Sequence, residues 1–163
     1  MPNEYLYDLN FLLGNKYKID KANFRSHNEF FTKKEVAKYC YDVFNNFLNL
    51  HKINLKTYHF IEPSCGDCSF YDLMPKHRRI GIDLEYKKEE ILCENFLNFT
   101  PIQNKKYLVL GNPPFGLRGN LALRFLNHSS KFADFVAFIL PPLFESDGKG
   151  SPKKKSKKFN SYP

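Results

Sequence analysis

The side chains best suited to chemistry follow an apolar stretch, at Asn112-Pro113-Pro114-Phe115. Two prolines have fixed φ angles and no N–H group, and they push the residue before them into an extended conformation. The asparagine amide can donate and accept hydrogen bonds, the carbonyl of Pro113 can accept one, and the ring of Phe115 offers a face for stacking. This set suits a flat heterocycle with an exocyclic amine. The alternative is a proline loop that merely ends a strand.

A second candidate pair consists of the acidic residues Glu62 and Asp83, which are 21 positions apart. Each stands at the end of an expected strand, and the turn between them contains Gly66. In nucleoside-binding α/β proteins, a carboxylate about twenty residues after such a turn accepts hydrogen bonds from ribose hydroxyls. One glycine does not make a dinucleotide-binding motif, so a pyrophosphate-binding role is not indicated. The alternative for Asp83 is an ordinary acid at a strand end.

The elements expected to position these side chains alternate between strands and helices. Thr32 and Glu35 have the spacing of a capping box, and apolar residues at helical spacing predict a helix over about 33–50. Further helices are expected just after the Gly66 turn, around 85–90 and over 119–130. Strands are expected at 58–62, 79–83, 91–93, 107–110 and 134–140. This alternation predicts an α/β fold with five parallel strands, whose carboxyl ends share one edge of the sheet.

Composition and charge limit the class of protein. With 163 residues, 42% of them hydrophobic, the chain can form one domain with a core. The formal charge is +8, and residues 151–163 contain five lysines and no acid. Such a surplus fits a polyanionic partner without requiring one. Because no apolar run is long enough to span a bilayer and no secretory signal is evident, we expect a cytoplasmic protein with no membrane partner.

The four cysteines include a single C-x-x-C pair, at positions 65 and 68, with no matching second pair. This spacing alone is weak evidence for zinc. We therefore expect reduced, mostly buried thiols and no metal site.

Six segments resemble, in order, the motifs of the S-adenosylmethionine-dependent adenine-N6 DNA methyltransferases, a family of amino-methyltransferases with an NPPF motif. The segments are Phe31-Thr32, the stretch EPSCGDCSF at 62–70, Gly81-Ile82-Asp83, Asn95-Phe96-Leu97, Asn112 to Phe115, and Phe138 to Pro141. The most specific are the 62–70 stretch and NPPF. The resemblance covers about residues 30–145. It implies a Rossmann-like catalytic domain of a restriction-modification enzyme, which methylates the N6 amine of adenine in DNA.

The resemblance implies roles in cofactor binding for eight residues. The methionine part of S-adenosylmethionine would contact Phe31, Thr32, Glu62, Ser64 and Gly66. Asp83 would accept hydrogen bonds from the ribose hydroxyls. Asn95, together with Phe96, would contact the adenine ring of the cofactor.

The resemblance also implies roles at the target base. Asn112 and the carbonyl of Pro113 would accept hydrogen bonds from the target amine, in a turn that Pro113 and Pro114 stiffen. Phe115 would stack on the adenine, which must be flipped out of the duplex to be reached.

Several features depart from the family pattern. Cys68 stands where a second glycine is usual and would crowd the cofactor, and Asn95 stands where an acid is usual. The chain has no counterpart of the final antiparallel hairpin or of a DNA-reading domain. We therefore expect an N-terminal extension at 1–30, a truncated catalytic domain at 31–145 and a basic disordered tail at 146–163. DNA specificity would then come from a recognition subunit in trans or be lost.

Three other functions are compatible with these motifs. NPPF does not distinguish DNA from RNA, so an RNA adenine methyltransferase is one alternative. A non-catalytic cofactor-binding subunit, or an inactive truncated fragment, is another. A glutamine-directed protein methyltransferase meets the same chemistry, although a tyrosine rather than Phe115 would fit it better.

Overall fold

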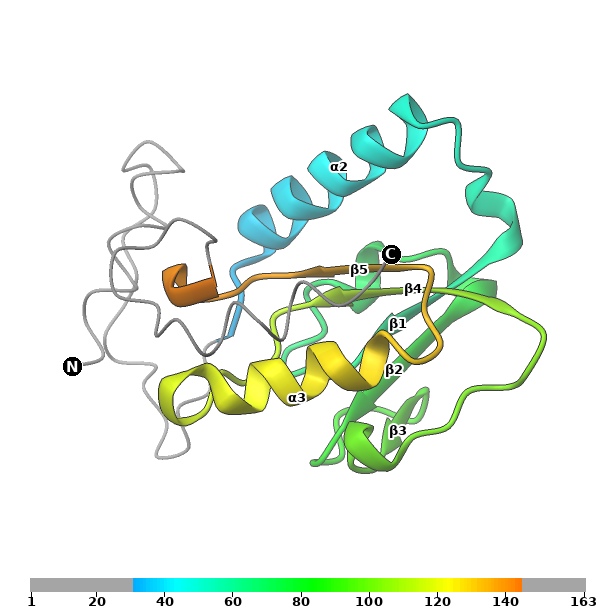
Figure 1. The fold of residues 1–163 in the computed structure, drawn as a ribbon. Coiled ribbons are helices and arrows are strands. Elements are labelled where there is room, and N and C mark those ends of the chain that lie inside the picture. Colours follow the sequence, from blue (N-terminus) through cyan, green and yellow to red (C-terminus); the bar gives the residue numbers. More distant parts are fainter. Residues whose placement is uncertain (1–30, 145–163) are drawn as a thin grey trace.

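The computed structural model describes residues 31–144, which form one five-stranded parallel sheet (Figure 1). The strands are β1 (Tyr58–Glu62), β2 (Arg79–Asp83), β3 (Ile91–Cys93), β4 (Lys106–Gly111) and β5 (Phe135–Phe138). Their order in the sheet is β3-β2-β1-β4-β5, and Phe60 of β1 pairs with Arg79 of β2 and Leu108 of β4. The predicted α/β fold with a Rossmann-like sheet is confirmed. The predicted extension at 1–30 and the tail at 146–163 lie outside the described residues.

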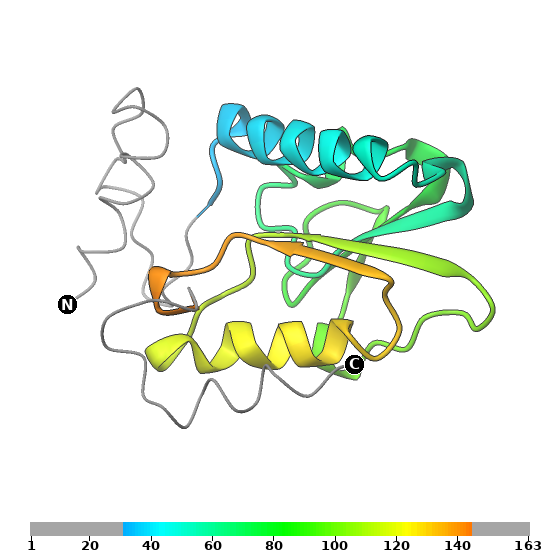
Figure 2. The same ribbon diagram turned by 45° about the horizontal axis from the view of Figure 1, so that its top comes forward.

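One α-helix covers each face of the sheet (Figures 1 and 2). These helices are α2 (Lys34–Leu50) and α3 (Asn120–Ser129), close to the predicted ranges. Successive side chains of a strand point to opposite faces. Accordingly, Phe60 and Leu108 belong to a buried cluster with residues of α2, whereas Ile61 and Val109 belong to one with Phe125 of α3. The sheet is therefore apolar on both sides, as a parallel sheet must be.

The N-terminus of α2 differs from the sequence prediction. Its cap residue is Lys33, and no side chain caps the first turn. The predicted capping box of Thr32 and Glu35 is therefore wrong. The carbonyl of Thr32 instead accepts a hydrogen bond from Ser69 Oγ at 2.7 Å. This bond ties the segment before α2 to the turn that follows β1.

Two of the predicted helices are replaced by irregular structure. The connection from β1 to β2 contains only the short 3₁₀ turns Tyr71–Leu73 and Lys76–Arg78, and residues 84–90 form a loop. Charged residues of this loop pair with other segments instead of along a helix. Lys88 Nζ lies 2.7 Å from an oxygen of Asp72, and Glu90 lies 3.3 Å from Arg79.

Strand β5 forms an edge of the sheet. It pairs with β4, and within residues 31–144 no strand pairs with its other side. β5 ends at Phe138, earlier than predicted, whereas β4 extends one residue further than predicted at each end.

Neither α-helix in this part of the chain combines the length and the apolar character that crossing a membrane requires.

Candidate functional site

A small hollow lies at the carboxyl edge of the sheet. That edge is on the left in Figure 1. The chain runs from β1 outward to β2 and β3, and then returns to β4 on the other side of β1. The strand order thus reverses between β1 and β4. In open α/β sheets, the loops diverge at such a point and ligands bind between them.

The hollow is formed by the segment before α2, the turn after β1 and the first residue after β4. Its lining residues are Phe31, Thr32, Glu62, Ser64, Cys65, Gly66, Asp67, Ser69, Phe70 and Asn112. Six of these were predicted as site residues from the sequence. Cys65, Asp67, Ser69 and Phe70 were not assigned a role there. Of the other predicted residues, none lines the hollow.

Glu62 brings a buried carboxyl group to the hollow. It ends β1, and its side chain belongs to a residue that is only 2% exposed. Its Oε2 accepts a hydrogen bond from the Tyr71 N–H at 2.6 Å. Burial raises the pKa of Glu62 well above its usual range, although the Tyr71 bond opposes this shift. A strongly perturbed acid in a cleft is a candidate functional residue.

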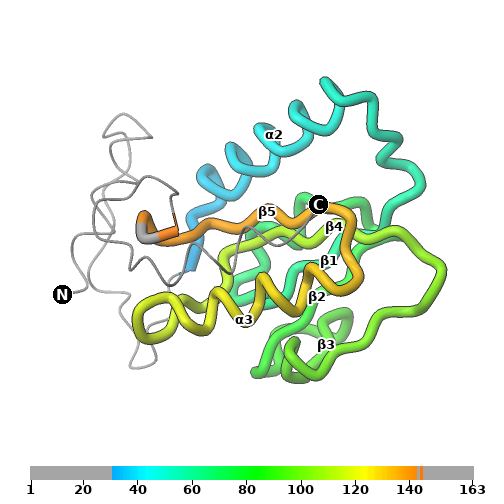
Figure 3. The backbone as a smooth tube through the Cα atoms, viewed as in Figure 1, coloured from blue at the N-terminus to red at the C-terminus, as the bar shows by residue number. Residues whose placement is uncertain are grey.

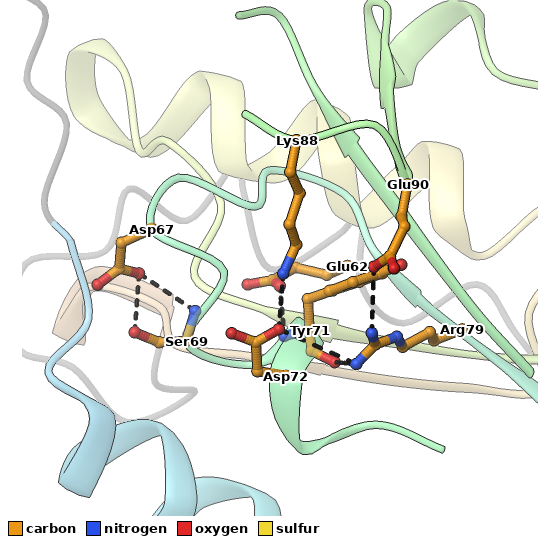
Figure 4. Close-up of polar contacts among 8 residues, drawn as sticks. All are labelled: Glu62, Asp67, Ser69, Tyr71, Asp72, Arg79, Lys88 and Glu90. Carbon is orange, nitrogen blue, oxygen red and sulfur yellow. Dashed lines mark hydrogen bonds and ion pairs between the residues drawn. The ribbon is translucent and has the colours of Figure 1, made fainter. Parts of the chain in front are cut away.

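Tyr71, whose N–H donates to Glu62, is contacted by two cationic side chains, Arg79 and Lys88 (Figure 4). The guanidinium carbon of Arg79 lies 4.0 Å from the centroid of the Tyr71 ring, and Lys88 Nζ lies 4.9 Å from it. Arg79 also donates a hydrogen bond to the Tyr71 carbonyl at 3.1 Å. Because cation–π contacts favour a fixed ring position, this network positions the Tyr71 N–H, which donates the hydrogen bond to Glu62.

Asp83 lies directly behind the turn that follows β1. Its Oδ2 accepts a hydrogen bond from the Gly66 N–H at 2.8 Å, and its Oδ1 accepts one from the Glu85 N–H at 3.0 Å. Lys87 Nζ lies 3.6 Å from Oδ1. The carboxylate therefore fixes two loops. Since a carboxylate can accept about four hydrogen bonds, it keeps capacity for a further donor.

Gly66 allows Phe31 to lie against the turn. Its φ is +51°, and a Cβ atom there would approach Cδ1 of Phe31 to 2.9 Å. Cys68 also has a positive φ, +66°, a conformation that favours glycine. Its side chain is buried with Cys65 and Tyr71. Cys68 is not among the lining residues of the hollow.

Ser69 connects the turn to the segment before α2. Its buried Oγ lies 2.7 Å from the Thr32 carbonyl oxygen and 2.7 Å from Asp67 Oδ1. Its N–H also donates to Asp67 Oδ1 at 3.2 Å. The sequence signal that could have identified this residue is Asp-x-Ser, an Asx-turn pattern. Ser69 therefore holds Thr32, and with it Phe31, beside the turn.

The motif Asn112 to Phe115 is fastened at both ends. Ser64 Oγ donates a hydrogen bond to the Asn112 carbonyl at 3.3 Å. The Phe115 carbonyl accepts from the N–H groups of Leu121 and Ala122 at 3.1 and 3.3 Å, at the start of α3. Pro113 is buried, and Pro114 and Phe115 are half-buried. Asn112 lines the hollow, whereas Pro113, Pro114 and Phe115 do not.

Asn95 and Phe96 lie away from the hollow. The side chain of Asn95 accepts a hydrogen bond from the Leu97 N–H at 3.0 Å, which caps the 3₁₀ turn Phe96–Asn98. Phe96 is buried, and its ring centroid lies 5.1 Å from that of Phe125 and 5.0 Å from that of His128. In this structure, therefore, Phe96 belongs to the core beneath α3.

Comparisons of the chain with protein-family models, with curated proteins and with solved structures found no match. Its function is therefore inferred from its own residues.

Proposed function

We propose that this chain is the catalytic part of an S-adenosylmethionine-dependent methyltransferase that modifies the N6 amine of adenine in DNA. The observation that carries the proposal is the convergence of Glu62, Gly66 and Asn112 on one hollow at the reversal of strand order. Asp83 bonds to Gly66 from directly behind the turn. The order of the motifs along the chain, which resembles that family, supports the same conclusion.

The residues around the hollow fit the chemical groups of this cofactor. Its methionine part carries an ammonium group, for which the buried Glu62 carboxyl is an acceptor. The turn after β1 presents to the hollow Gly66, which has no side chain, and the hydroxyl of Ser64. Asp83 has acceptor capacity left for ribose hydroxyls. When bound, S-adenosylmethionine supplies an electrophilic methyl group on a sulfonium.

The residues after β4 would prepare the target amine. An aromatic amine is a poor nucleophile, because its lone pair is delocalised into the ring. Two acceptors, Asn112 Oδ1 and the Pro113 carbonyl, would draw the amine hydrogens out of the ring plane and localise that lone pair. Phe115 would stack on the base and orient it. Orientation and preorganised acceptors of this kind lower the barrier without a metal or a strong base.

A second candidate function is that of a cofactor-binding subunit that requires a partner chain. The open edge of β5 within residues 31–144 favours it, because an unpaired apolar edge strand readily accepts another strand. The partner could also supply DNA recognition. The positive charge of the chain supports a nucleic acid as substrate in either case.

The proposal is tested by calorimetric titration of S-adenosylmethionine into the purified chain, followed by transfer of a radiolabelled methyl group to DNA and RNA. The wild type should bind the cofactor. Asp83→Asn should bind it at least about tenfold more weakly, a loss of about 1.4 kcal/mol. Asn112→Ala should transfer no methyl group, because it removes an acceptor for the target amine, and its cofactor affinity is measured in the same titration because Asn112 also lines the hollow.

Each other outcome has a defined meaning. A folded wild type that does not bind S-adenosylmethionine contradicts the proposal. Binding with methyl transfer only after a second chain is added supports the subunit instead. Transfer to RNA but not to DNA favours the RNA adenine methyltransferase.

A further inference from the structure

The turn that joins β4 to α3 presents an apolar side chain to solvent. Within it lies the 3₁₀ turn Leu117–Gly119, and Leu117 is 82% exposed. Among the described large apolar side chains of residues 31–142, none is as exposed. Single exposed apolar residues are ordinary on protein surfaces. The backbone that presents Leu117 is what makes this one informative.

That backbone has three positive φ angles within four residues: Gly116 at +66°, Arg118 at +52° and Gly119 at +71°. A residue with a Cβ, such as Arg118, rarely adopts this conformation. It persists only where the surrounding structure imposes it, which happens preferentially at functional sites. The strained turn therefore calls for a reason beyond connecting two elements.

The turn is held firmly against α3. Gly119 N–H donates a hydrogen bond to the Gly116 carbonyl at 3.2 Å. A Cβ on Gly116 would approach Leu121 Cβ to 2.7 Å, so the turn lies directly on the helix. Together with the two bonds to the Phe115 carbonyl, these contacts hold both sides of the turn at the start of α3, and Leu117 projects from it.

The projection lies at the edge of the sheet that also carries the hollow. In Figure 3, the segment between β4 and α3 curls at the left, where β5 ends and α2 begins. Leu117 follows Asn112 by five residues, and its neighbour Arg118 is exposed and cationic. An apolar tip with an adjacent cation thus stands at the same edge of the sheet as the amide that is proposed to hold the target amine.

We propose that Leu117 is a wedge that enters the DNA duplex and occupies the space left by the flipped adenine, while Arg118 contacts an adjacent phosphate. This inference rests on the proposed function. A base must be unstacked before it reaches an active site, and apolar side chains inserted between base steps compensate for lost stacking. A turn that is hydrogen-bonded on both sides suits this role, because less conformational freedom of its backbone is lost on insertion.

The test compares Leu117→Ala with the wild type on a duplex and on the same target as a single strand, which needs little unstacking. We expect kcat/KM for the duplex to fall at least about tenfold and that for the single strand to change less than about twofold, with unchanged S-adenosylmethionine affinity. A mismatch opposite the target should partly restore duplex activity. Ile102→Ala is the matched control, since Ile102 is 66% exposed in the loop before β4, at the opposite edge.

A second measurement makes the test independent of methyl transfer. With 2-aminopurine at the target position of a duplex, the wild type and Ile102→Ala should raise its fluorescence, and Leu117→Ala should not. Equal losses on duplex and single strand, or full duplex activity in the variant, would overturn the wedge. If the wild type methylates nothing, the proposed function fails, but the 2-aminopurine fluorescence still tests the wedge. An equal rise in fluorescence with Leu117→Ala, or no rise with the wild type, overturns the wedge.

Discussion

Replacing Asp83 by asparagine tests whether its carboxylate fixes the turn that forms the hollow. The side chain is 13% exposed, and each of its oxygens accepts a hydrogen bond from a backbone N–H, that of Gly66 or that of Glu85. An amide has one oxygen, so Asp83→Asn can satisfy one of the two donors but turns an NH₂ group toward the other. It also removes the charge that faces Lys87 at 3.6 Å.

The loss can be estimated from the lost bond. A hydrogen bond to a charged group contributes about 1.5–3 kcal/mol, and one such bond is lost in Asp83→Asn. We therefore expect the free energy of unfolding to fall by about 2 kcal/mol. With a urea m-value of about 2 kcal/mol per molar, the midpoint of urea unfolding should fall by about 1 M.

The control for Asp83→Asn is Glu94→Gln, which removes the same charge from an exposed residue just after β3. A midpoint within about 0.2 M of the wild type is expected for it, since surface substitutions usually change stability by less than about 0.5 kcal/mol. If Asp83→Asn unfolds at the same urea concentration as Glu94→Gln, the carboxylate does not hold the turn and this reasoning is refuted.

Three further predictions concern stability. Burial raises the pKa of Glu62 above its unfolded value of about 4.3. The folded state should therefore be most stable below about pH 4, and its stability should fall as pH rises toward the raised pKa. Glu62→Gln should flatten this part of the dependence of stability on pH, and parallel pH profiles for the variant and the wild type would contradict the prediction. Gly81→Ala should destabilise the fold by about 1–3 kcal/mol, because its Cβ would meet the Ile91 side chain and approach Cys65 Sγ to 2.8 Å. A thermal midpoint equal to that of the wild type would show that these neighbours can move aside without cost. Leu108→Ala should lose about 2–5 kcal/mol, since Leu108 of β4 is fully buried in the cluster that includes residues of α2. Leu84→Ala on the surface should lose less than about 0.5 kcal/mol, and similar urea midpoints for the two variants would argue against the assigned core.

Local patterns predicted most of the fold correctly. The strands were recognisable because each is a short apolar run bounded by polar or turn residues, and α2 and α3 because their apolar residues repeat at helical spacing. One prediction failed at a segment whose charged residues have distant partners. Residues 84–90 looked like a charged helix, but Lys88 pairs with Asp72 and Glu90 pairs with Arg79. These partners are distant in sequence, so no local pattern could reveal them.

The sequence by itself determined the order of the strands along the chain and the residue types at their carboxyl ends, because both are local properties. It therefore brought Glu62, Gly66 and Asn112 to one edge of the sheet. Only the tertiary structure decided that Ser69 joins the turn to Thr32 and that Phe96 lies in the core. Such roles depend on which segments meet in space, and that is settled by packing across the whole sheet rather than by neighbours in the chain.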